Sequence, residues 1–102
     1  MDLKKAFGEA LRKIRTCRGL TQEDFSSISS RTYLSTLERG VYSPTVEKLD
    51  AISSVLRVHP ITVLAACYMN ADPNLGAEAL LRRLEYELKE IDSNRPDTQR
   101  NE

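Results

Sequence analysis

Apolar side chains recur along most of the chain at the three- and four-residue steps of a helix. The clearest run is at the start, where one face carries Leu3, Ala6, Phe7, Ala10, Leu11 and Ile14. This spacing predicts an amphipathic helix over residues 3–17. Five further segments are predicted to be helical: residues 22–28, residues 31–39, a segment after Thr45, a segment opened by His59-Pro60, and residues 75–91. Strand-like runs of β-branched residues are missing, so the pattern predicts an all-α fold.

Capping residues mark where these helices begin and end. Gly19 is a natural stop for the first helix, because glycine enters the left-handed conformation without a steric penalty. Thr21 and Asp24 have nearly the spacing and chemistry of a capping box at the start of the second helix. Ser30 is predicted to cap the third helix and Gly40 to end it. In the third, fourth and fifth predicted helices, the core positions are Leu34 and Leu37, then Leu49, Ile52, Val55 and Leu56, then Ile61, Leu64 and Cys67 or Tyr68.

The second and third predicted helices are short and close together, which is typical of a helix-turn-helix. In that motif the second helix of the pair projects unblocked side chains into the major groove of DNA. Its outer face here carries hydroxyls and one long donor, without an acid: Arg31, Thr32, Ser35 and Thr36. Thr21 and Gln22, at the start of the preceding helix, are placed to contact phosphate. Glu38 lies at the far end, where it could pair with a cation.

Three motifs cover this region: GLTQEDF, then SRTYLSTLERG, then SPTVEKLDAI. Together they resemble the Cro/repressor-type helix-turn-helix family, also called the XRE family, over about residues 7–66. The resemblance implies a five-helix, lambda-repressor-like DNA-binding domain at residues 1–71. It also implies a bacterial transcriptional regulator that acts as a homodimer on palindromic operators.

The resemblance further implies roles for single residues. The positions that read bases in the family correspond to Arg31, Thr32, Ser35 and Thr36. Positions that contact the DNA backbone correspond to Gln22, Tyr33, Arg39, Tyr42 and Ser43. The chain departs from the family pattern between Phe25 and Tyr33, where it is two residues shorter and lacks the usual glycine. Either the second helix ends early or the turn is tighter.

Within the last predicted helix, apolar residues follow alternating steps of four and three, the spacing of a coiled-coil seam. The seam residues are Ala77, Leu81, Leu84, Leu88 and Ile91. One interpretation is a dimer interface that sets two DNA-reading helices about 34 Å apart, one turn of duplex. The alternative is a helix packed on its own domain, to which Leu75 and Leu80 could dock it. Residues 92–102 are polar and are predicted to be disordered.

The chain has 15 basic and 15 acidic residues, and their distribution matters more than their sum. Residues 1–40 hold eight Lys or Arg against five acids, a balance of +3. Residues 41–74 carry −1 and residues 75–102 carry −2. The basic first part therefore suits phosphate, while the acidic last part suits a different partner.

The remaining features exclude other classes of protein. Cys17 and Cys67 form neither a disulfide framework nor a metal motif, and no apolar run is long enough for a membrane span. With His59 as its one histidine and no Ser/His/Asp set, the chain is not expected to be an enzyme or to need a cofactor. We therefore expect a cytoplasmic, nucleoid-associated regulator of double-stranded DNA. The alternative is an antitoxin or adaptor whose last helix binds a partner protein.

Overall fold

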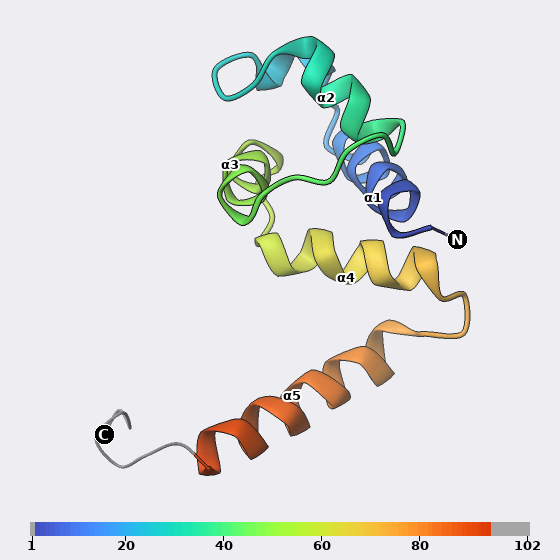
Figure 1. Ribbon diagram of the computed structural model, residues 1–102, viewed down its shortest axis with the longest axis vertical. Coiled ribbons are helices and arrows are strands. Elements are labelled where there is room, and N and C mark those ends of the chain that lie inside the picture. Colours follow the sequence, from blue (N-terminus) through green and yellow to red (C-terminus); the bar gives the residue numbers. More distant parts are fainter. Residues whose placement is uncertain (1, 95–102) are drawn as a thin grey trace.

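The computed structural model describes residues 2–94, and these residues form helices joined by turns (Figure 1). The elements in chain order are α1 (Leu3–Cys17), the 3₁₀ helix η1 (Gln22–Phe25), α2 (Arg31–Glu38), α3 (Val46–Leu56), α4 (Pro60–Ala71) and α5 (Ala77–Ser93). The first five elements surround one core, and α5 lies outside it. The predicted all-α fold is confirmed.

η1 and α2 begin where the capping residues indicated, and local hydrogen bonds stabilise their first turns. The backbone N–H of Thr21 donates to the Asp24 carboxylate at 2.7 Å. The Ser30 hydroxyl accepts from the backbone N–H of Tyr33 at 3.0 Å, which satisfies one of the free donors at the start of α2. Gly19 follows α1 with a φ of 71°, the left-handed conformation expected of it. These contacts lie within a few residues of each other, so sequence spacing alone could predict them.

The core lies where α1, η1, α2, α3 and α4 meet. Its buried apolar residues are Ala6, Phe7, Ala10, Leu11, Phe25, Leu34, Leu37, Leu49, Ile52, Leu56, Val63 and Cys67. Burying a side chain the size of Leu or Phe contributes about 1.5–3 kcal/mol, so this cluster is the main source of stability. α1 packs on α4 over much of its length and carries α2 on its other side. α1, which packs on α4, therefore supports α2.

The prediction of a second helix over residues 22–28 is wrong. The helical turn ends at Phe25, and its bonds are of the tighter 3₁₀ kind, such as Ser26 N–H to the Glu23 carbonyl at 3.0 Å. Phe25 has to reach the core and Ser30 already caps α2, so only four residues remain for the connection. A longer α-helix does not fit in that length. The two-residue shortening is thus accommodated by an early helix end.

Three smaller predictions also need correction. α2 ends at Glu38 with Arg39 as its cap, one residue early. α4 buries Val63, while Ile61, an expected core residue, is 50% exposed. Of the two alternatives Cys67 and Tyr68, Cys67 is the one in the core, and Tyr68 is 50% exposed. Nearly every residue of α4 is apolar, so periodicity could not identify its inward face. Val55 of α3 is only half-buried against the core.

α5 begins at Ala77 rather than residue 75 and continues through Ser93, so residues 92 and 93 are helical and not part of a tail. The rest of the predicted tail, residues 95–102, lies outside the described residues. The first half of α5 approaches α4, with Leu80 and Leu84 half-buried. Farther along, α5 diverges from α4 (Figure 1), and Leu88 and Ile91 are exposed. Leu80 thus packs α5 on its own domain. Most of the seam residues of α5 nevertheless stay exposed.

Of the helices described, none alone has the length and apolar character to cross a membrane; α3 and α4 would qualify only as a pair, and the chain bends by 101° between them.

Candidate nucleic-acid interface

α2 is held with one face against the core and the other outward. Leu34 and Leu37 are completely buried, so the opposite side of the helix faces away from the domain. On that side Arg31 and Thr32 are exposed. Ser35 and Thr36 are half-buried, and the Thr36 hydroxyl donates to the backbone carbonyl of Tyr33 at 2.6 Å. The four predicted base-reading residues therefore lie on one short helix, with Thr36 offering only acceptor lone pairs.

Glu38 is the one acid of α2, and it points inward, with the residue 5% exposed. The guanidinium of Arg15, on α1, donates two hydrogen bonds to the Glu38 carboxylate, from Nε to Oε2 at 2.6 Å and from Nη2 to Oε1 at 3.0 Å. Arg12 approaches the same carboxylate at 3.5 Å. A fork of this kind is among the strongest charge-assisted contacts in proteins. It fixes the angle of α2 on α1 and also removes a negative charge from the outer face.

Gln22 completes this group. Its Nε2 donates to Glu38 Oε1 at 3.1 Å, while Arg15 Nη1 donates to the backbone carbonyl of Leu20 at 3.0 Å. The start of η1 is thereby fixed to the end of α2. Gln22 is half-buried, so the amide predicted to contact DNA is oriented first by a contact inside the protein.

Opposing effects act on the pKa of Glu38. Burial raises it, but the hydrogen bonds from Arg15 and Gln22 and the charges of Arg15 and Arg12 outweigh burial, so the pKa lies below its ordinary value. The same hydrogen bond with Glu38 shifts the pKa of Arg15 in the opposite direction, above its ordinary value. Both groups are therefore charged at neutral pH, and the pair is an ion pair.

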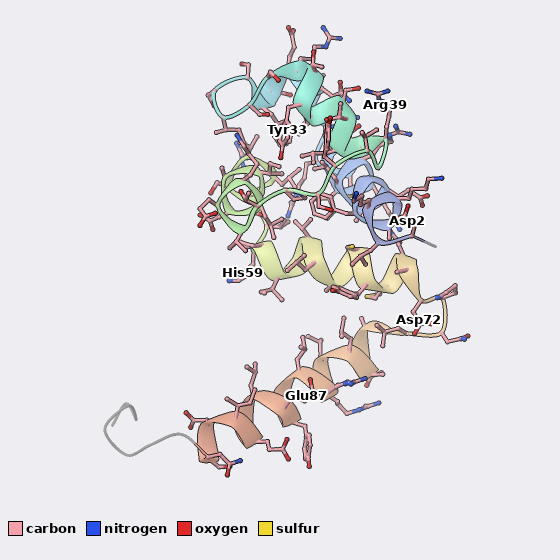
Figure 2. All side chains as sticks on the ribbon, in the orientation of Figure 1. Asp2, Tyr33, Arg39, His59, Asp72 and Glu87 are labelled. Atoms are coloured by element: carbon pink, nitrogen blue, oxygen red, sulfur yellow. The ribbon has the colours of Figure 1, made fainter. Side chains whose placement is uncertain are left out.

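Tyr33 lies on the side of α2 that faces α3 (Figure 2). The Lys48 ammonium of α3 stands 5.5 Å from the centre of its ring and donates to the backbone carbonyl of Ile28 at 2.6 Å. Lys48 therefore ties the connection before α2 to α3. The sequence pattern does not predict a role for Lys48, because its partner is 20 positions away and no local motif marks the pair.

The other predicted backbone-contacting residues lie at the two ends of the η1–α2 unit. Arg39 is exposed at the end of α2 (Figure 2), and Tyr42 and Ser43 are exposed in the loop that follows. Thr21 is exposed at the start of η1. The structure thus brings every predicted DNA residue to α2 or to the segments next to it, and α5 contributes none.

Comparison with known proteins identifies the family. The helix-turn-helix family profile matches residues 11–62, which is half of the chain and spans η1, α2 and α3. The chain belongs to the XRE-type helix-turn-helix family. The matched residues include the pair η1–α2, and the lambda-repressor-like architecture predicted from the sequence is confirmed.

Relatives of this helix-turn-helix protein are regulators. It is 38% identical over 66 residues to y4dJ of Sinorhizobium fredii, described as an uncharacterized HTH-type transcriptional regulator; the match covers 63% of this chain and 86% of that one. Two crystal structures of the clp gene regulator ClgR from Corynebacterium glutamicum are similar. One is 30% identical with a TM-score of 0.64, covering 69% of this chain and 92% of that chain. The other is 26% identical with a TM-score of 0.63, covering 89% and 90%.

The restriction-modification controller protein C.Esp1396I is a third relative. It is 27% identical with a TM-score of 0.61, over 71% of this chain and 95% of its own. Each of these names describes a regulator and none describes an enzyme. The helix-turn-helix protein is accordingly a DNA-binding transcriptional regulator by family and by fold.

Proposed function

We propose that this helix-turn-helix protein binds a specific, palindromic DNA operator as a homodimer in the bacterial cytoplasm, with α2 in the major groove. The observation that carries the proposal is the outer face of α2. That face offers Arg31 and Thr32 to solvent, while the only acid of the helix is turned inward and neutralised by Arg15. Base edges present acceptors and donors that such side chains can read.

The roles follow from the placement of each residue. Arg31 is the one side chain on this face that can make a bidentate contact with guanine. Thr32, Ser35 and Thr36 supply short polar contacts to neighbouring bases. The phosphate contacts come from Thr21, Gln22, Tyr33, Arg39, Tyr42 and Ser43, at both ends of the unit. Phosphate contacts release counterions, so overall affinity should fall as salt is added.

Arg31→Ala tests this assignment. On an operator selected from a random duplex library, the variant should bind about 10- to 100-fold more weakly, because one good bidentate base contact contributes roughly 1–3 kcal/mol of discrimination. On random duplex the loss should be much smaller. Arg82→Ala, which removes the same charge from exposed α5, should change neither affinity. An equal loss on both DNAs for Arg31→Ala would make it a phosphate contact and contradict the base-reading role.

The dimer in this proposal is formed through the α5 seam of Ala77, Leu81, Leu84, Leu88 and Ile91. The described residues bury little of that seam within one copy, and Leu88 is 64% exposed. A monomer rarely leaves a row of large apolar residues in water without a partner. Pairing two copies would place the two α2 helices on successive turns of one DNA face.

Leu88→Asp tests the seam. Because Leu88 is outside the core, the variant should keep its helix content, which circular dichroism measures. Its dimer should dissociate on the order of 100-fold more readily, since two buried leucines are lost at about 1.5–3 kcal/mol each. Tyr86→Asp is the matched control, because Tyr86 is 67% exposed on the opposite side of the helix. Sedimentation equilibrium gives both constants. A Leu88→Asp dimer as stable as the wild type would place the interface elsewhere.

The same exposed seam favours a second candidate function. An antitoxin or adaptor would use α5 to hold a partner protein, and α2 could still bind DNA. This function is favoured if the purified chain is a monomer and a stoichiometric partner copurifies with the wild type but not with Leu88→Asp.

A further inference from the structure

The seam of α5 has acidic residues along both of its edges. Glu78 and Glu85 follow Ala77 and Leu84 on one edge, and Glu87 precedes Leu88 on the other. Cations one turn away pair with these acids: Arg82–Glu78 at 3.7 Å, Lys89–Glu85 at 3.7 Å and Arg83–Glu87 at 3.1 Å. All three pairs are exposed and hence weak. The edges of the seam are therefore still acidic where a partner would approach.

Two α5 helices packed directly on each other would bring these acids together. In a parallel pair the residues before one seam face the residues after the other, and in an antiparallel pair like edges face like edges. An antiparallel pair sets the edge of Glu78 and Glu85 against its own copy, and a parallel pair sets Glu87 against Asp92 of the other helix. Since like charges facing each other are unfavourable, the seam is matched to a basic surface and not to its own copy.

The fold offers such a surface between α1 and α4. A groove of about 480 Å³ runs there, with Ile14, Val58 and Met69 among its apolar lining. Two charged residues line it, Lys13 and Arg18, and both are cations with exposed side chains. This groove shares Thr62, Ala66 and Met69 of α4 with a second apolar groove, about 320 Å³, between α4 and α5.

The α4 wall of both grooves is uncharged, because residues 60–71 contain no Asp, Glu, Lys or Arg. An acidic-edged helix lying along α4 would thus meet apolar side chains beneath it and cations at one side. The apolar seam and the groove match in character, and their charges are opposite.

We infer that the α5 seam of one copy lies in the α1–α4 groove of a second copy, with the acids of one edge, Glu78 and Glu85, close to Lys13 and Arg18. The inference rests on the proposed homodimer and specifies its contact surfaces. Each copy carries both surfaces, so the contact occurs twice about a two-fold axis and closes on itself. Lys13 and Arg18 then hold the dimer together and are not needed for reading bases.

Charge reversal on the full chain tests the inference. One variant carries Glu78→Lys and Glu85→Lys, a second carries Lys13→Glu and Arg18→Glu, and a third carries all four changes and keeps the wild-type net charge. Sedimentation equilibrium without DNA measures the dissociation constant of each dimer. Glu47→Lys with Asp50→Lys, on exposed positions of α3, controls for net charge alone, and circular dichroism confirms that helix content is retained.

Each double variant should dissociate roughly tenfold or more above the wild type, because an attraction becomes a repulsion at two symmetric sites. The fourfold variant should return to within about threefold of the wild type. Added salt should weaken the wild-type dimer, because it screens opposite charges.

Two results would overturn the inference while leaving the homodimer intact. One is a fourfold variant as weak as the double variants; the other is a wild-type dimer that strengthens with salt, as direct α5–α5 pairing predicts. A wild-type protein that is monomeric at every concentration would instead reject the homodimer itself, and the inference with it. Arg31→Ala titrations would then still decide whether α2 reads bases.

Discussion

Replacing Glu38 by alanine is expected to lower the free energy of unfolding by about 3–5 kcal/mol, because it leaves a partner charge without compensation. Arg15 has only 14% of its side chain exposed, and Glu38 accepts two hydrogen bonds from it. Gln22 loses its partner as well. In a domain of this size such a loss lowers the melting temperature by at least about 12 °C. Urea and thermal denaturation measure both quantities.

Two controls isolate the ion pair. Glu47→Ala removes an exposed acid of α3 and should change stability by no more than about 0.5 kcal/mol. Removing both partners with Arg15→Met and Glu38→Leu should recover much of the loss, since a buried pair is often replaced by apolar residues without large cost. Glu38→Ala with wild-type stability would show that this contact does not fix α2 on α1.

The Glu38 contribution should also depend on pH in a defined direction. The folded-state pKa of Glu38 lies below its ordinary value, so the folded protein releases this proton more readily than the unfolded chain. The contribution is complete above the ordinary value and is lost as the pH falls through the folded-state pKa. Wild-type stability should therefore fall more steeply in acid than that of Glu38→Ala.

Gly8→Ala is expected to destabilise the protein by about 2–3 kcal/mol, although alanine is normally the better helix former. Gly8 is buried where α1 crosses the end of α2. A Cβ at this position would lie 2.6 Å from the backbone carbonyl oxygen of Leu37 and closer still to that of Glu38. Backbone atoms cannot move out of the way as the end of a flexible side chain can. α1 and α2 would therefore have to separate.

Gly76→Ala is the matched control for Gly8→Ala. Gly76 has a φ of −87° and open space around the position of a Cβ, so this change should stay within about 1 kcal/mol, the usual range for a cap residue. Thermal denaturation of both variants gives the comparison. A Gly8→Ala protein as stable as the wild type would contradict the close approach of α1 and α2.

The sequence predicted what local chemistry determines. Ser30 caps α2 and Gly19 follows α1 because contacts three or four residues apart decide those positions. The direction of α2 was also predictable, since Leu34 and Leu37 define its inward face. The outward position of Arg31 and Thr32 follows from the same pattern.

Features that depend on residues far apart in the chain could not be predicted in full. The early end of η1 follows from the reach of Phe25 into the core, which no local pattern encodes. The Arg15–Glu38 contact joins residues 23 positions apart, and Gln22 joins it from 16 positions away. Spacing could suggest that Glu38 pairs with a cation, but not which one. The face of α4 was ambiguous for the opposite reason, because its residues are apolar on every side.

We propose that the outer face of α2 reads base edges. Selection from a random duplex library tests it most directly, performed at two salt concentrations with the wild type and repeated with Arg31→Ala and Arg82→Ala. We expect one enriched, two-fold symmetric sequence for the wild type and for Arg82→Ala, at both salt concentrations. Arg31→Ala should lose a guanine preference at one position in each half-site and keep the others. Enrichment of the same sequence by all three proteins, or of none by the wild type, would contradict the claim.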